Sequence, residues 1–138
     1  MPGADERLNV ARQWIQKAEN DLKNAAYTLR MGKECPTDTV CFHAQQCVEK
    51  YVKALLVVQG TDFPRTHDIS QLLALLPDGV RPPVTVQEQA RLTDYATITR
   101  YPGDYELISL AETRQAIRVA RRVRGAIRKL LPRKVTHA

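Results

Sequence analysis

Apolar residues recur along this chain at intervals of three and four, which is the period of an amphipathic helix. The first stripe consists of Trp14, Ala18, Leu22, Ala25, Ala26 and Leu29. Gly32 is placed to end this helix in a left-handed conformation. A second helix is predicted between Pro36-Thr37 and Gly60, on a stripe of Val40, Ala44, Cys47, Tyr51, Leu55 and Val58.

A short third helix follows, and a loop separates it from the rest of the chain. Thr66 is its expected N-cap, and Pro77 is expected to stop it. Its apolar residues are Ile69, Leu72, Leu73 and Leu76. Residues 77–84 contain three prolines and one glycine, so this segment is predicted to be a loop.

Capping-box patterns mark the starts of the last two helices. Thr85 and Glu88 open a fourth helix that runs to about Ile98. Ser109 and Glu112 open the last helix in the same way. The apolar side of this last helix consists of Ala116, Ile117, Ala120, Val123, Ile127, Leu130 and Leu131.

The pattern as a whole predicts an all-α protein, because no segment shows sustained alternation of apolar and polar residues. Four substantial amphipathic helices and one short helix, joined by brief connections, are typical of an up-and-down four-helix bundle with an additional short helix. The chain shows no internal repeat and no linker. We therefore expect a single domain over residues 1–138, with its core at about residues 8–131.

Composition excludes several classes of protein. A hydrophobic fraction of 43% and a charged fraction of 26% rule out collagen-like, low-complexity and disorder-dominated chains. No apolar run approaches the roughly 20 residues of a membrane span. The segment Met1–Arg7 lacks the pattern of a signal peptide, and three cysteines cannot all pair with one another. We expect a cytoplasmic protein that makes no membrane contact.

The net charge of +6 is unevenly distributed. No acidic residue follows Glu112, whereas nine basic residues do, so the upstream chain has 12 Lys and Arg against 15 Asp and Glu. In the last helix a broad basic stripe could follow a nucleic-acid backbone; it contains Arg114, Arg118, Arg121 or Arg122, and Arg128. The alternative is that these residues favour the helix dipole, keep the protein soluble and pair with acids on neighbouring helices.

The cysteines do not predict a metal site. Cys35, Cys41 and Cys47 are six residues apart, whereas structural zinc sites favour pairs separated by two to four residues. Their expected role is that of small buried hydrophobic residues, and no metal is expected.

One face of the second predicted helix is polar, because Gln46, Glu49, Lys50 and Lys53 recur at spacings of three and four. This face could line a polar groove that offers Lys50 or Lys53 to a phosphate. Alternatively it is a solvated face with Glu–Lys pairs inside the helix.

Tyrosines cluster beside an arginine between residues 95 and 105. Tyr95, Tyr101 and Tyr105 are three of the five tyrosines in the chain, and Arg100 and Asp104 lie among them. An arginine beside aromatic rings can bind a phosphate and stack a base. The alternative is that the tyrosines seal one end of the bundle while Arg100 caps helix carbonyls.

His67 precedes the short helix, where a histidine can perform acid–base chemistry or act as a structural residue. The serines, histidines and aspartates of the chain do not suggest an assembled catalytic triad. The chain also has no glycine-rich phosphate-binding loop.

Four segments form a series whose order and spacing are specific. They are WIQKAENDL at 14–22, FHAQQCVEKYVKALL at 42–56, THDI at 66–69 and TRYP at 99–102, within a span of about 12–130. The series resembles the HEPN family of small helical proteins, in the subgroup encoded beside minimal nucleotidyltransferases. The resemblance implies a helical bundle, a homodimer with polar residues in the cleft between subunits, and a nucleotide or RNA as ligand. It also implies a nucleotidyltransferase partner in a toxin–antitoxin-like pair, and no cofactor.

Many HEPN proteins are metal-independent ribonucleases that carry an arginine followed, after four to six residues, by a histidine. This chain departs from that pattern. His43 has no arginine at that distance, Arg65 is too close to His67, and three residues separate Arg133 from His137.

The candidate ligand-binding residues are Lys50, Lys53, Arg100, Tyr101, Asp104 and Tyr105, and the candidate catalytic residues are His67 and Arg100. Three functions follow as hypotheses. The first is a nucleotide- or RNA-binding module that pairs with a nucleotidyltransferase. The second is a metal-independent ribonuclease with a displaced site, formed by Arg100 with His67 or His43. The third is a purely structural interaction protein.

Overall fold

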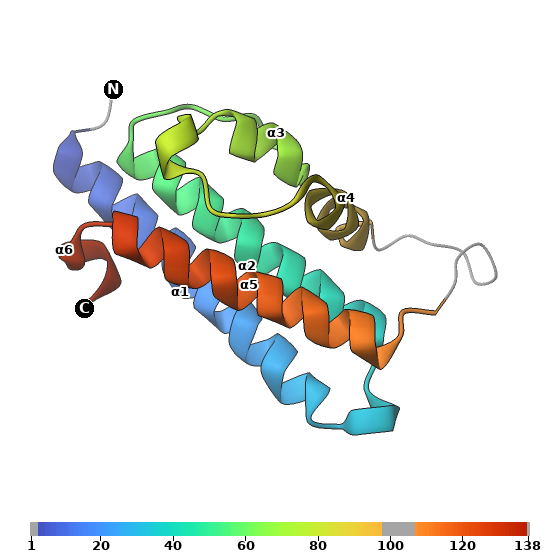
Figure 1. Ribbon diagram of the computed structural model, residues 1–138. Coiled ribbons are helices and arrows are strands. Elements are labelled where there is room, and N and C mark those ends of the chain that lie inside the picture. The colour runs from blue at the N-terminus through green and yellow to red at the C-terminus, as the bar shows by residue number, and fades with distance from the viewer. Residues whose placement is uncertain (1–2, 98–106, 138) are drawn as a thin grey trace.

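Three long helices form the body of the protein. The computed structural model describes residues 3–97 and 107–137, and within these ranges every regular element is helical, which confirms the all-α prediction. The long helices lie side by side (Figure 1); the first runs opposite to the other two, which are parallel to each other. They are α1 (Ala4–Leu29), α2 (Thr37–Val58) and α5 (Leu110–Leu130).

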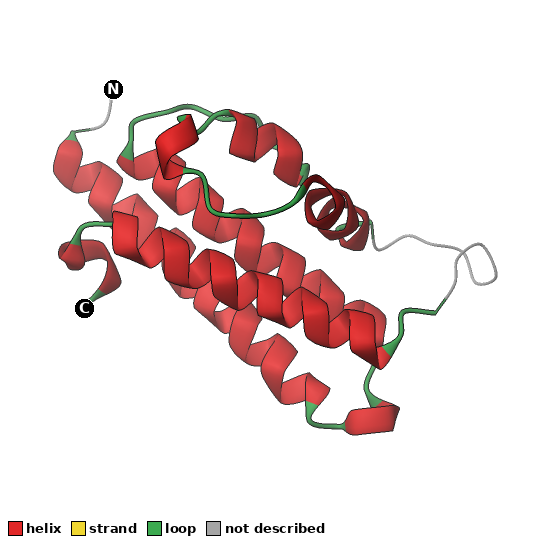
Figure 2. Cartoon of the chain, in the orientation of Figure 1, coloured by secondary structure: helices red, strands yellow, loops and turns green. Residues whose placement is uncertain are grey.

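Three shorter helices complete the fold (Figure 2). The first two, α3 (Ile69–Ala74) and α4 (Val86–Tyr95), pack against α2 and against each other. Figure 1 views α4 nearly along its axis, so this helix crosses the long helices rather than extending the row. The last one, α6 (Arg133–Thr136), was not predicted and folds back against α1 after Pro132. Two 3₁₀ turns, Gly32–Glu34 and Asp78–Val80, lie in the connections.

Local signals define most of the helix ends. The Thr85 side chain accepts the Glu88 backbone N–H and the Glu88 side chain accepts the N–H of Thr85, which confirms the predicted capping box. Ser109 accepts the backbone N–H of Glu112 at 3.1 Å. The predicted end of the fourth helix, Ile98, lies outside the described residues.

The predicted start of the short helix was wrong by two residues. The N-cap of α3 is Asp68, whose carboxylate accepts the Gln71 N–H at 3.1 Å. Thr66 lies further upstream and its hydroxyl accepts the Asp68 N–H instead. Both residue types cap helices well, and the tertiary position of His67 decides between them because its side chain turns back to Glu49.

The core centres on α2, in which 13 of 22 residues are buried. Cys35, Cys41 and Cys47 are all buried, which confirms their expected role as small hydrophobic residues. Burial raises the pKa of the Cys41 thiol to about 11, so this thiol is almost entirely protonated near neutral pH. Among the described residues, no helix is both long enough and apolar enough to cross a membrane.

Two glycines provide a matched test of the backbone. Gly125 lies inside α5, where an added Cβ would have no neighbour within 4 Å. Gly60 has φ +70°, a conformation that costs a residue with a side chain free energy. We expect Gly125→Ala to raise the free energy of unfolding by about 0.5–1 kcal/mol, and Gly60→Ala to lower it. Urea unfolding measures both, and a Gly125→Ala variant that is less stable than the parent would contradict this account.

Candidate functional site

A buried carboxylate organises the polar face of α2. Glu49 is 2% exposed, and its Oε2 accepts Lys53 Nζ at 2.9 Å. Its Oε1 accepts Gln45 Nε2 at 2.9 Å and lies 2.8 Å from His67 Nδ1. Because a buried charge is stable only when it is paired and hydrogen-bonded, these partners are what allow Glu49 to be buried. We call Gln45, Glu49, Lys53 and His67 the Glu49 cluster.

His67 is the exposed member of this cluster, with 66% of its side chain accessible. An ionised carboxylate can only accept hydrogen bonds, so Nδ1 of His67 donates to Glu49. In the neutral imidazole this leaves Nε2 as the acceptor. The carboxylate therefore selects the tautomer and orients the ring, as second partners of functional histidines do.

Lys53 is enclosed rather than presented to solvent. Its ammonium nitrogen lies 5.3 Å from the centre of the Trp14 ring and 5.7 Å from that of Phe63. The two rings meet edge to face at 6.4 Å, and the Lys53 side chain is 8% exposed. One interpretation of the sequence predicted a Glu–Lys pair inside this helix on a solvated face. Glu49 and Lys53 do form such a pair, but both side chains are buried.

A second carboxylate serves the other edge of the same face. Asp21 of α1 lies 2.8 Å from His43 Nδ1 and accepts a hydrogen bond from Lys50 Nζ. All three side chains are partly buried, with exposed fractions of 11% for Asp21, 23% for His43 and 19% for Lys50. We call these residues the Asp21 cluster. Lys50 retains more access to solvent than Lys53 does.

The two clusters share one side of α2. At 3.6 residues per turn, His43, Gln46, Glu49, Lys50 and Lys53 fall within about a third of the helix circumference. Gln46 lies between the clusters and donates to Gln45 Oε1 at 2.6 Å. The polar face therefore runs from Asp21 on α1 to the segment before α3, and its accessible charged or titratable groups include His43, Lys50 and His67.

Several basic residues of α5 hold the bundle together. Arg124 donates from two nitrogens to the Glu19 carboxylate at 2.8 and 2.9 Å, and Tyr51 donates to it at 2.8 Å. Burial raises the pKa of Glu19, but the hydrogen bonds from Arg124 and Tyr51 lower it further, to below its usual 4.5. The hydrogen bonds to ionised Glu19 therefore stabilise the folded protein above pH 4.5, and this stabilisation is lost as the pH falls through the lowered pKa of Glu19.

The predicted basic stripe of α5 is therefore divided. Arg122 pairs with Glu88 of α4 at 2.8 Å, and Arg128 donates to Tyr51 and to the Thr136 carbonyl. These two arginines serve the fold, as the structural interpretation expected. The remainder of the stripe, Arg114, Arg118 and Arg121, is exposed.

Part of the tyrosine-rich segment lies within the described residues. The hydroxyl of Tyr95 on α4 donates a hydrogen bond to Glu112 on α5. Burial, as the larger cause, and this hydrogen bond both raise the pKa of Tyr95. Tyr95 therefore fastens α4 to the start of α5. The predicted site residues Arg100, Tyr101, Asp104 and Tyr105 lie outside the described residues.

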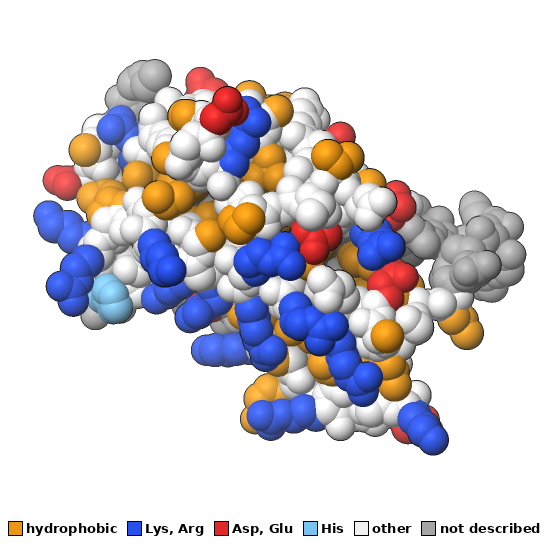
Figure 3. Space-filling view, viewed as in Figure 1, with side chains coloured by type: hydrophobic (Ala, Val, Ile, Leu, Met, Phe, Trp, Pro, Cys, Tyr) orange, Lys and Arg blue, Asp and Glu red, His pale blue; other side chains and the backbone are white. Residues whose placement is uncertain are grey.

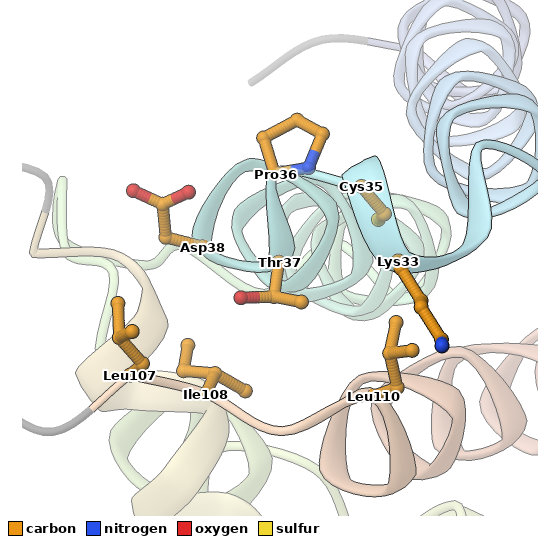
Figure 4. Close-up of a pocket in the computed structure, with 8 residues that line it drawn as sticks. All are labelled: Lys33, Cys35, Pro36, Thr37, Asp38, Leu107, Ile108 and Leu110. Carbon is orange, nitrogen blue, oxygen red and sulfur yellow. The ribbon is translucent and has the colours of Figure 1, made fainter.

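A separate pocket of about 350 Å³ opens where the start of α2 faces the segment before α5 (Figure 4). Its polar groups come from Lys33, Thr37 and Asp38, and its apolar wall includes Leu107 and Leu110. No predicted site residue of the described ranges lines it. In the same ranges, no group of three or more His, Cys, Asp or Glu side chains could hold a metal ion.

Comparisons with known proteins agree with this architecture. The sequence model of the HEPN domain matches residues 11–130, so the chain belongs to the HEPN family. The crystal structure of ST0689, an archaeal HEPN homologue, is 31% identical, with a TM-score of 0.68 over 87% of this chain and 96% of that one. The crystal structure of TT1696 from Thermus thermophilus is 28% identical, with a TM-score of 0.70 over 88% of this chain and 98% of that one.

A curated relative matches over a shorter stretch. The protein named "Putative toxin MJ1304", from Methanocaldococcus jannaschii, is 41% identical over 63 residues. The match covers 46% of this chain and 39% of that protein.

The Glu49–Lys53 pair can be tested by removing one or both charges. We expect Glu49→Leu to lower the free energy of unfolding by about 3–5 kcal/mol, because it leaves the buried Lys53 ammonium unpaired. The double variant Glu49→Leu/Lys53→Met removes both charges and should recover most of that loss. Thermal or urea unfolding gives both values. A double variant that is no more stable than the single one would show that the pair is not the source of the loss.

Proposed function

We propose that this protein is a nucleotide- or RNA-binding HEPN module that acts as the toxin-like member of a pair with a nucleotidyltransferase. Membership of the HEPN family supports the ligand class, and the likeness to a protein named as a toxin supports the biological role. The proposal includes a homodimer, in which the polar face of α2 would lie in a cleft between two copies.

One observation carries the proposal: Lys50 on α2 and His67 in the segment before α3 both belong to the polar face, and each is held by a carboxylate that is itself largely buried. Asp21 and Glu49 provide these carboxylates. Positioned donors on a fixed scaffold can meet a phosphate without reorganising first. In this arrangement Lys50 and Arg100 bind phosphate, Tyr101 or Tyr105 stacks against the base, and Asp104 accepts hydrogen bonds from it. Lys53 supports the site through Glu49.

Nucleotide titration calorimetry tests this function. Lys50→Ala should weaken nucleotide binding by roughly tenfold or more, since a hydrogen bond to a charged group contributes about 1.5–3 kcal/mol. Lys129→Ala removes the same charge from the exposed outer side of α5 and should leave the affinity unchanged. Equal affinities for the parent and Lys50→Ala, with unchanged melting temperatures, would remove Lys50 from the site. Absence of binding by the parent to nucleotides and RNA alike would favour a purely structural interaction protein.

The His67–Glu49 contact favours a second candidate function, metal-independent RNA cleavage. His67 Nε2 would accept the proton of a 2′-hydroxyl, and the 2′-oxygen would then attack the adjacent phosphorus. The bond from phosphorus to the 5′-oxygen would break as that oxygen takes a proton from a second group, such as His43. The products would be a 2′,3′-cyclic phosphate and a 5′-hydroxyl, with no metal required.

RNA cleavage by the purified protein in the presence of a chelator tests this candidate. Activity should disappear in His67→Asn and in Arg100→Ala, and should remain in His137→Asn, which changes an exposed histidine in the C-terminal segment. The pH profile should report a histidine. RNA that stays intact across a broad set of substrates would leave the binding function alone.

A further inference from the structure

A positively charged surface lies away from the α2 polar face. It consists of Lys23 on α1, Arg30 at the C-cap of α1, and Arg114, Arg118 and Arg121 on α5, all of them exposed. We call it the α1/α5 basic surface. In Figure 3 the Lys and Arg side chains gather over α5 and the neighbouring part of α1.

The ion pair of Arg124 with Glu19 brings the two rows of this surface together. Because α1 and α5 run in opposite directions (Figure 1), the residue one turn after Glu19 faces the residue one turn before Arg124. These are Lys23 and Arg121. Arg30, the C-cap residue of α1, comes seven residues after Lys23, and Arg114 comes seven residues before Arg121, a helix rise of about 10.5 Å in each case. The cations thus form two facing rows with the same spacing.

Three acidic groups on the neighbouring helices are already engaged. Glu19 is held by Arg124 and Tyr51, Glu88 by Arg122, and Glu112 by Tyr95. Within residues 3–97 and 107–137, none of the five cations of the α1/α5 basic surface has a carboxylate within ion-pair distance. The five cations therefore create a positive potential that attracts a polyanion.

An aromatic ring stands exposed among these charges. Tyr27 follows Lys23 by one turn of α1, and 70% of it is accessible. The Arg30 guanidinium lies 4.8 Å from the centre of the ring. A shallow hollow beside it is lined by Asn20, Asn24 and Thr28 in addition to Lys23 and Tyr27. Cations that follow a backbone, next to an aromatic ring on which a base can stack, are the features of a single-strand binding surface.

Gly125 adds a further local feature. It lies on the outer side of α5, one turn beyond Arg121, and nothing lies within 4 Å of where its Cβ would be. Internal packing therefore does not explain this helix-breaking residue. Its bare backbone leaves the surface open at this end for a strand to pass close to the helix.

We propose that the α1/α5 basic surface binds single-stranded RNA, with Lys23, Arg114 and Arg121 on its phosphates and one base stacked on Tyr27. This interaction goes beyond the proposed function, because it lies outside the α2 polar face and does not require a nucleotide there. It is independent of sequence, since both stacking and phosphate contacts accept any base.

The test is fluorescence anisotropy of labelled oligouridylate over a series of salt concentrations, using variants that change exposed side chains only. Tyr27→Ala should weaken binding by about fivefold or more, whereas Tyr27→Phe should keep it, because stacking does not need the hydroxyl. Arg114→Gln/Arg121→Gln should weaken binding and reduce the slope of log affinity against log salt by about 1.4, or about 0.7 for each phosphate that is no longer neutralised. The matched control Arg91→Gln/Arg133→Gln removes the same charge from α4 and α6 and should leave the slope unchanged.

The outcomes separate this surface from the α2 face. Variants of the α1/α5 basic surface should bind a mononucleotide as the parent does, and Lys50→Ala should leave the salt slope for oligouridylate unchanged. In one outcome, the parent protein binds oligouridylate through Tyr27 and Arg121 and yet binds no mononucleotide. That result would refute the proposed function and support this inference. Equal salt slopes for the two double variants, or full affinity in Tyr27→Ala, would overturn it. So would a change in oligomeric state in Tyr27→Ala without a change in RNA affinity, which would identify a protein interface.

Discussion

The burial of the Glu49 carboxylate constrains much of the structure around it. A carboxylate that is 2% exposed needs several hydrogen-bond partners, because water cannot provide them. Its partners come from α2 itself and from the segment that precedes α3, so the electrostatics of one residue determine where that segment lies. The same requirement orients His67 and starts α3 at Asp68 rather than at Thr66. The orientation of His67 and the start of α3 thus both depend on the buried charge of Glu49.

The basic residues of the chain divide into two groups with different tasks. Arg122, Arg124 and Arg128 are linked to partners on other elements and stabilise the packing of α5. Arg114 and Arg121 lie on the outer side of the same helix and are exposed to solvent. Composition and helical spacing alone do not distinguish these groups. The distinction follows from which acidic residues the neighbouring helices place within reach.

Much of the fold could be predicted because its signals are local. The periods of the apolar stripes, the Thr85–Glu88 capping box and the left-handed Gly32 and Gly60 each depend on residues a few positions apart. Less of the candidate site could be predicted. Lys50 and His67 were recognised as candidates, but Asp21 was not, because an aspartate on the polar side of an amphipathic helix resembles any solvated carboxylate. Its role appears only when α1 packs beside His43 and Lys50.

Local sequence patterns were enough to predict the long helices, their order, the polar stripe of α2 and the excess of positive charge after Glu112. These features arise from contacts and spacings within one or two turns of a helix, which any short segment of chain specifies. Which charged side chains meet depends on the packing of the helices: Glu49 with His67, Asp21 with Lys50, and Glu19 with Arg124, 105 positions apart. Such pairs depend on how the faces of separate helices fit together. Their stabilising free energy comes from charge attraction and hydrogen bonds between separate helices, which no single segment provides before the chain has folded.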